Sequence, residues 1–288
     1  MKVRKENNMY GRNRSEGWKH AKLSGHENEE LVKELLDNDE KYTREFLQRI
    51  NLDDKNLVET SIGGLHEHNV DSVCGRKTKS KTDLKLYFAD ETFANISVKK
   101  SLGGQVYFVR AKNFIDVFEA QFNERIPENV CRAIVLFWAA APDAVSIIER
   151  YADRTKVFDY DMQIRHKSLN ADTLRCYDES LYHALLQWFK DNVYELTYLC
   201  FATGAVRDKD EWSDFVWYKN MLGENDVDAV FDIAEISKAA SRASSDEVYY
   251  GASNGGTTIQ LPFGFVQWHQ KQLQFHHNYV KVRSLIEK

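Results

Sequence analysis

Two strand-like runs joined by a short turn constrain this chain more than any other feature. The runs cover residues 81–88 and 95–101, and the stretch Ala-Asp-Glu-Thr at residues 89–92 suits a hairpin turn. Because successive side chains of a strand point to opposite faces, the hairpin has one apolar and one polar face. The apolar face holds Leu84, Leu86, Phe88, Ile96 and Val98. The polar face holds Asp83, Ser97 and Lys99, so an acid and a lysine share one side of a small sheet.

A carboxylate and an ammonium group on one sheet face suit a metal-dependent phosphodiesterase. The Asp83 carboxylate can hold a divalent cation, while Lys99 stabilises charge on the scissile phosphate or orients the attacking water. The alternative is a cross-strand salt bridge on an exposed face, which contributes about 0–1 kcal/mol. Alternation places Lys100 on the apolar side, so Lys99 is the better candidate.

An amphipathic helix precedes the hairpin in the sequence. Residues 25–36 carry leucine and valine at the i, i+4 spacing of a buried helix face, and acidic residues in the first turn suit the helix dipole. A second helix is predicted over residues 41–50, and a later one over residues 227–242. Glu29 lies in the first helix and is a candidate site residue, although a solvated acid is the alternative, and Glu30 replaces it if the helix is rotated by one position.

In this order, the helix and the hairpin resemble the PD-(D/E)XK nuclease superfamily. Asp83, thirteen intervening residues and then Ser97-Val98-Lys99 are similar to its D…(D/E)xK site. The pattern Gly25-x-x-x-Glu29-x-x-Val32-x-x-x-Leu36 is similar to its first core helix. The stretch 79–83 and the strand 96–101 most resemble small type II restriction endonucleases. The resemblance covers about residues 25–110.

This resemblance implies a sequence-specific endonuclease that cleaves double-stranded DNA with Mg²⁺. Asp83, the Val98 backbone carbonyl and Glu29 would then ligate the metal, and Lys99 would contact the attacking water and the phosphate. Ser97 stands where the superfamily has a metal-binding acid. A hydroxyl group is a poorer ligand for a hard cation than a carboxylate, which favours one-metal chemistry and leaves open an inactive site.

Two polar segments are candidates for DNA contact. A basic run leads into Asp83, and we assign four of its residues to the DNA backbone: Arg76, Lys77, Lys79 and Lys81. The carboxy-terminal strands, residues 263–282, are rich in amides, and four residues there are candidate readers of base edges: Gln267, His269, Gln270 and Gln274. Glutamine reads adenine in the major groove, which admits a two-stranded β-ribbon. The alternatives are a solvated charge run and a polar sheet face.

Composition excludes several other classes of protein. A net charge of −5 is not that of a protein that coats nucleic acid over its whole surface. No apolar run reaches about 18 residues, so we expect no membrane span and a cytoplasmic location. The four cysteines form no CxxC pair, which predicts buried free thiols. His66 and His68 could bind a metal from one strand face, but no third ligand lies nearby.

The order of predicted elements, which is a helix, a small sheet, a helical middle and a β-rich end, indicates a mixed α+β fold. The resemblance implies that the first part is a restriction-endonuclease-like core, in which helices flank a small mixed sheet. We expect residues 1–125 to form the nuclease core and residues 126–288 to serve DNA binding or dimerisation, packed with the core as one unit. The expected function is that of a type II restriction endonuclease. Such an enzyme would act together with a cognate DNA methyltransferase, and it could be a homodimer or a monomer. A repair, recombination or structure-specific nuclease, or a non-cleaving DNA-binding protein on a decayed nuclease core, are the alternatives.

Overall fold

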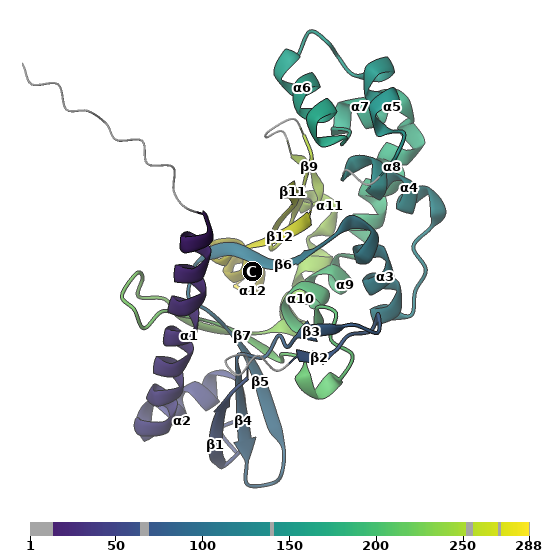
Figure 1. Cartoon of the computed structure of the whole chain (residues 1–288). Helices are drawn as coiled ribbons and strands as arrows, with labels where there is room; N and C mark the ends of the chain where they lie inside the picture. Colours follow the sequence, from purple (N-terminus) through teal and green to yellow (C-terminus); the bar gives the residue numbers. More distant parts are fainter. Residues whose placement is uncertain (1–13, 64–68, 139–140, 252–255, 270–271, 288) are drawn as a thin grey trace, which may run out of the picture.

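The computed structural model describes residues 14–63, 69–138, 141–251, 256–269 and 272–287, with the backbone alone for residues 14–22. Helices and strands are both abundant, and the chain forms two five-stranded sheets (Figure 1). The predicted mixed α+β class is therefore confirmed. None of the described helices has the length and apolar character that a membrane crossing demands.

The first sheet carries the predicted hairpin at its centre. Its strands, in spatial order, are β1 (Leu57–Ile62), β4 (Leu84–Phe88), β5 (Phe93–Lys99), β7 (Phe215–Lys219) and β8 (Asp228–Asp232). Strand β4 pairs antiparallel with β5, and β5 pairs parallel with β7. The sheet is therefore mixed, and its parallel partner comes from a distant part of the sequence.

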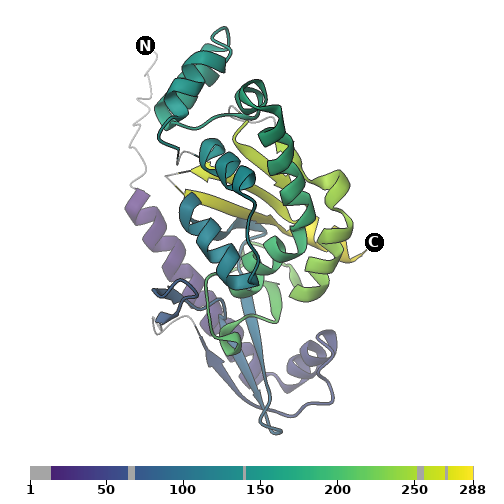
Figure 2. The same ribbon diagram turned by 90° about the vertical axis from the view of Figure 1, so that its right-hand side faces the viewer.

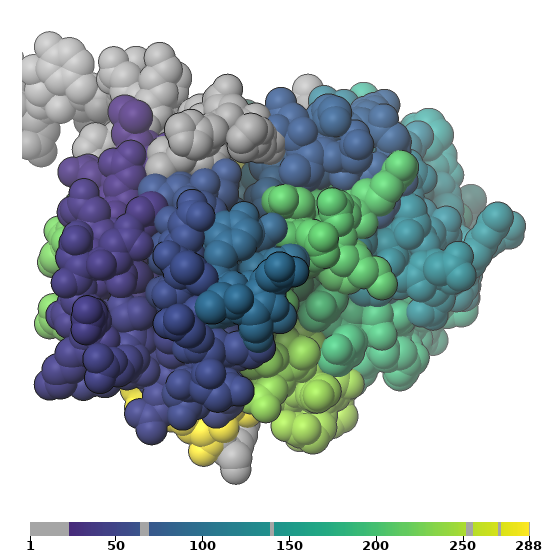
Figure 3. Space-filling view, turned by 90° about the horizontal axis from the view of Figure 1, so that it is seen from below, coloured from purple at the N-terminus to yellow at the C-terminus, as the bar shows by residue number. Residues whose placement is uncertain are grey.

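The apolar face of the hairpin packs against two helices, α1 (Arg14–Asn38) and α2 (Glu40–Arg49). Val32 of α1 and Phe46 of α2 are fully buried with Leu84, Leu86 and Ile96 of the hairpin. Seen from below, the surface of α1 and α2 adjoins that of the first strands (Figure 3). Both predicted helices are confirmed, and α1 begins earlier than the predicted Gly25.

The second sheet is antiparallel throughout. Its strands, in spatial order, are β6 (Gly103–Val109), β12 (Gln272–Asn278), β11 (Gly264–His269), β10 (Thr258–Leu261) and β9 (Tyr249–Gly251). Val266, Leu273 and Phe275 on one face are fully buried in the larger core. Helices from the middle of the chain lie over this face (Figure 2).

The helical middle contributes most of that larger core. The remaining elements are the helices α3 (Ala111–Phe122), α4 (Glu128–Phe137), α5 (Ala144–Tyr151), α6 (Val157–His166), α7 (Ala171–Tyr177), α8 (Glu179–Asp191), α9 (Val193–Tyr198), α10 (Ile233–Arg242), α11 (Ser244–Glu247) and α12 (Tyr279–Ile286), the π-helical turn η2 (Leu199–Thr203), the 3₁₀ turn η3 (Lys209–Glu211), and the small ribbon of β2 (Asn69–Asp71) and β3 (Lys77–Lys79). Each of the two five-stranded sheets contains strands from both residues 1–125 and residues 126–288.

Two sequence-based assignments of secondary structure were wrong in part. We expected a helix over residues 227–242, but residues 228–232 form β8 because they pair with β7. Helix α10 begins only at Ile233, where the Asp232 side chain caps it by accepting a hydrogen bond from the Glu235 amide nitrogen. We expected strands up to Val282, but the Asn278 side chain caps a helix that starts at Tyr279. The expectation of buried thiols was also partly wrong, since Cys74 and Cys176 are exposed.

Candidate active site

Asp83 lies immediately before β4, and its backbone is fixed on both sides. Its amide nitrogen donates to the Ile96 carbonyl at 2.9 Å, and its carbonyl accepts from the Gly63 amide at 2.9 Å. The hairpin alternates as predicted, with the β4 side chains Leu84, Leu86 and Phe88 buried. The carboxylate of Asp83 is thereby held beside the end of β5.

Two groups of β5 donate to the same carboxylate oxygen. The Val98 amide nitrogen donates to Oδ2 of Asp83 at 2.7 Å, and the Ser97 hydroxyl donates to it at 3.0 Å. Ser97 is only 2% exposed, so its hydroxyl is committed to this contact rather than to solvent. Charge-assisted bonds of this kind orient a carboxylate strongly.

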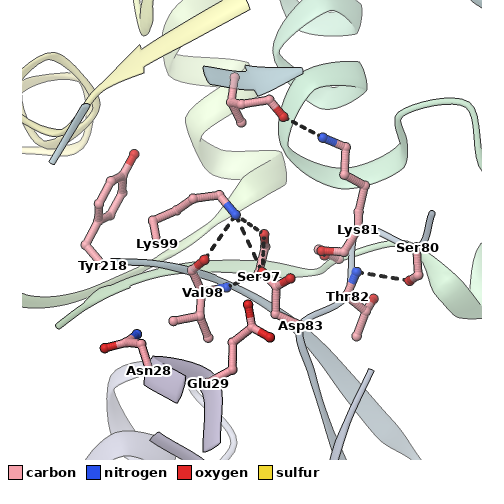
Figure 4. Close-up of polar contacts among 12 residues, drawn as sticks. Asn28, Glu29, Ser80, Lys81, Thr82, Asp83, Ser97, Val98, Lys99 and Tyr218 are labelled. Atoms are coloured by element: carbon pink, nitrogen blue, oxygen red, sulfur yellow. Dashed lines mark hydrogen bonds and ion pairs between the residues drawn. The ribbon is translucent and has the colours of Figure 1, made fainter. Parts of the chain in front are cut away.

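Lys99 completes the polar face of the hairpin. Its Nζ lies 2.5 Å from the Ser97 Oγ, 3.2 Å from the Val98 carbonyl and 3.5 Å from Oδ2 of Asp83 (Figure 4). The side chains of Asp83 and Lys99 are each 21% exposed, so the pair is partly shielded yet reachable from solvent. The hydroxyl of Ser97 therefore links the lysine to the acid by a chain of two hydrogen bonds.

Glu29 of α1 points from below toward Asp83 (Figure 4). Its burial, together with the negative charge of Asp83, raises the pKa of Glu29 to about 8, although Lys99 acts in the opposite direction. The His26 Nδ1 lies 3.3 Å from the Glu29 carboxylate. Glu30, the alternative in the sequence, is exposed. The fold therefore brings Glu29, and not Glu30, to the polar end of the hairpin.

Asn28 fixes this part of α1 against the sheet, and sequence reasoning missed it. Its side-chain amide donates to the Lys219 carbonyl at 3.0 Å and accepts from the Met221 amide at 2.7 Å. Asn28 is 1% exposed, and these bonds attach α1 to the end of β7. No sequence motif indicates this role, because the partners are more than 190 positions away.

The oxygen atoms at this site are the ligand type that hard divalent cations prefer. They belong to the carboxylates of Asp83 and Glu29, the Val98 carbonyl and the Ser97 hydroxyl, and Mg²⁺ usually completes such a shell with several waters. A cation between the two carboxylates would relieve the repulsion by Asp83 that, after burial, is the next cause of the raised Glu29 pKa. Within the described residues, no group of three or more His, Cys, Asp and Glu side chains forms a metal cluster, so waters and backbone would have to contribute.

The basic run divides into exposed residues and one buried group. Arg76, Lys77 and Lys79 are exposed, and Lys77 pairs with Asp71 at 2.7 Å on the small ribbon. Lys81 differs, because its Nζ is turned inward and donates to two backbone carbonyls. Burial, with Lys99 nearby, lowers the pKa of Lys81 to about 8. We assigned Lys81 to the DNA backbone from the sequence, but its ammonium group is engaged with backbone carbonyls of the protein.

The amide-rich strands place their candidate residues on one face of the second sheet. Gln267 and Gln274 are direct partners across β11 and β12, and His269 faces Gln272 in the same register. Alternation puts these side chains opposite the buried Val266 and Phe275. The same face includes Gln105 of β6, which the sequence did not single out, opposite His276. Gln270, His66 and His68 lie outside the described residues.

No family model and no curated protein matches this chain. Among solved structures, it is similar to the restriction endonuclease MspI in complex with its cognate DNA, with 11% sequence identity and a TM-score of 0.46. The similarity covers 86% of this chain and 83% of the MspI chain. A likeness this remote gives no support to a function, which must be inferred from the site itself.

Proposed function

We propose that this protein is a Mg²⁺-dependent endonuclease that cuts double-stranded DNA at specific sequences, in the manner of type II restriction endonucleases. The observation that supports the proposal is the meeting of Asp83, Lys99 and Glu29 at one end of the hairpin, from three different elements. An acid pair beside a lysine is the arrangement that metal-assisted phosphodiester hydrolysis needs.

Each residue has a distinct role in this proposal. Asp83, Glu29 and the Val98 carbonyl would hold the cation, which supplies charge stabilisation at the phosphate and a bound water of lowered pKa. Lys99 would donate to the attacking water or to a phosphate oxygen, since its ammonium group is already held 3.5 Å from Asp83. Ser97 would keep both groups in place through its two hydrogen bonds.

The DNA would be held by two different kinds of contact. The exposed Arg76, Lys77 and Lys79 would pair with phosphates, whereas Gln267 and Gln274 would meet base edges together with His269 and Gln270. The proposal keeps residues 1–125 as the nuclease core and residues 126–288 as the part for DNA binding or dimerisation. It also includes a cytoplasmic location, a homodimer as one possible assembly and a cognate DNA methyltransferase that protects the host genome.

Incubation of the purified protein with plasmid DNA and Mg²⁺ tests this function. We expect discrete fragments, and we expect Asp83→Ala and Lys99→Ala to reduce cleavage by at least about 1,000-fold, because each removes a charge needed at the transition state. Circular dichroism would verify that both variants are folded. Cleavage by either variant near the wild-type rate would move the active site elsewhere.

Ser97 favours one alternative function, a DNA-binding protein that does not cleave. A hydroxyl stands where the resembled nuclease site has its second acid, so one carboxylate ligand is missing, and this hydroxyl is engaged with Asp83 and Lys99. Tight duplex binding with no cutting in Mg²⁺ or Mn²⁺ would support this alternative. Smeared products or cleavage confined to DNA junctions would instead support a repair or recombination nuclease.

A further inference from the structure

The buried ammonium group of Lys81 joins three parts of the fold at one point. Its Nζ donates to the Val106 carbonyl at 2.7 Å and to the Cys200 carbonyl at 2.9 Å. It also lies 5.2 Å from the centre of the Tyr107 ring. Strand β6 and the turn η2 are therefore tied to the segment that leads into β4.

Both carbonyl groups belong to irregular backbone. Val106 is the extra residue of a β-bulge, because Tyr107 pairs with Phe275 and Gln105 pairs with His276. Such a residue is left out of the strand ladder. Cys200 lies in the π-helical turn that ends α9, where the last carbonyls lack partners within the helix and attract a positive charge. Lys81 therefore donates hydrogen bonds to two carbonyl groups that lie outside a regular helix or strand ladder.

The site around the lysine is closely fitted. Gly204, which ends the π-helical turn, has a φ of +51°, and a Cβ there would lie 3.0 Å from the Lys81 Cε. A glycine thus accommodates both the left-handed turn and the lysine side chain.

The short path from Lys81 to Asp83 is anchored at every residue. The Ser213 hydroxyl donates to the Lys81 carbonyl at 2.9 Å, and the Thr82 hydroxyl donates to the Glu211 carbonyl at 3.1 Å. The Asp83 amide donates to Ile96 at 2.9 Å. Only Thr82 separates Lys81 from Asp83, so these contacts and those of the Lys81 ammonium group together set where the Asp83 backbone lies.

We propose that Lys81 is a positioning residue for Asp83: its ammonium group, by pairing with the Val106 and Cys200 carbonyls, fixes the place of the Asp83 carboxylate beside Val98 and Lys99. This role rests on the proposed function for its catalytic consequence, but the structural consequence can be measured without any DNA. The Val98 amide donates to Asp83 at 2.7 Å and therefore reports directly where that carboxylate is.

Amide hydrogen exchange, followed by nuclear magnetic resonance, tests the positioning. In Lys81→Met, which keeps the length of the side chain but removes its donors, the Val98 amide should exchange at least about 10-fold faster than in the wild type. The Leu86 amide in the middle of β4 should not change. The matched control is Lys79→Met, an exposed lysine of the same run, which should leave both amides unaffected. Unchanged exchange at Val98, or equal acceleration at Val98 and Leu86, would overturn the proposal.

A second variant covers the case in which Lys81→Met does not fold. Ser213→Ala removes the hydrogen bond to the Lys81 carbonyl and leaves the ammonium group in place. It should accelerate exchange at Val98 by a smaller factor, again without a change at Leu86. No acceleration at Val98 in a folded Ser213→Ala variant would count against the anchored path on which the proposal depends.

Cleavage kinetics separate this role from a DNA contact. With saturating enzyme, Lys81→Met should lower the single-turnover rate by about 100-fold, because small displacements of reacting groups have effects of that size. Its affinity for duplex DNA in Ca²⁺ should stay within about 3-fold of the wild type, whereas Lys79→Met should weaken binding. The reverse pattern would make Lys81 a phosphate contact. A wild-type protein that does not cut DNA would refute the proposed function, while the exchange result would still decide the positioning role.

Discussion

Ser97 donates a hydrogen bond to Oδ2 of Asp83 at 3.0 Å and, through the same oxygen, accepts one from Lys99 at 2.5 Å. The hydroxyl group thus connects the two charged residues. An acid there would face Asp83 directly, and a cation would be needed to hold both carboxylates together. Hydrogen bonds within the protein therefore hold the acid and the lysine of the candidate site next to each other.

Replacement of Ser97 should alter the metal dependence of cleavage. Ser97→Asp adds a carboxylate ligand, so half-maximal cleavage should need at least about 3-fold less Mg²⁺. Ser97→Ala should cost less than about 10-fold in rate, because the Val98 amide and Lys99 still hold Asp83. Mg²⁺ titrations of single-turnover cleavage measure both effects. A folded but inactive Ser97→Ala variant would show that the hydroxyl takes part directly in the reaction.

Glu29 should make the metal-free protein less stable as the pH rises. Burial and the charge of Asp83 raise the pKa of Glu29 from 4.5 to about 8, so the folded state binds a proton that the unfolded state releases between these values. Stability contributed by the neutral form is full below about pH 4.5 and is lost as the pH rises toward 8. In EDTA, the Tm of the wild type should fall by at least about 2 °C more than that of Glu29→Gln between pH 5 and pH 8. An equal fall of the Tm with pH in the two proteins would refute the buried position of this carboxylate.

Asp228 should contribute stability that is lost in acid. Burial alone would raise its pKa, but hydrogen bonds from Lys219, Tyr42, Trp217 and Arg49 together lower it below the ordinary value of 3.8. A lowered pKa means that the contribution is complete above about pH 4 and disappears as the pH falls further. Asp228→Asn should therefore destabilise the protein by about 2 kcal/mol at pH 7, with a smaller difference at pH 3. Urea unfolding at both pH values checks this, and a difference that grows in acid would be inconsistent with it.

Phosphate contacts and base contacts should respond differently to salt and to sequence. Lys79→Met should weaken binding to all duplexes alike. It should also reduce the slope of the logarithm of the binding constant against the logarithm of the salt concentration by about one ion. Gln267→Ala or Gln274→Ala should cost about 1–3 kcal/mol, concentrated at one base pair. Binding in Ca²⁺ to cognate and singly substituted duplexes, at several salt concentrations, distinguishes the two. Undiminished discrimination in both glutamine variants would assign specificity to another part of the chain.

The sequence predicted the hairpin and its polar face because strand alternation depends only on neighbouring residues. Asp83, Ser97 and Lys99 could be placed on one side by counting, whereas Glu29 was a candidate only through the family resemblance, with Glu30 as the alternative. Strand β8 could not be predicted, because residues 228–232 become a strand only by pairing with β7. The role of Lys81 was equally hidden, since its partners lie 25 and 119 positions away and depend on a bulge and a π-helical turn.

The central claim is tested most directly by sequencing the ends of DNA that the purified protein has cut. A library of random duplexes would be incubated with Mg²⁺ and either the wild type or Asp83→Ala. We expect the wild-type ends to share one short sequence, cut at a fixed position, and we expect no ends above background with Asp83→Ala. Ends scattered without a common sequence, or the same ends with both proteins, would contradict a sequence-specific endonuclease whose active site is built around Asp83.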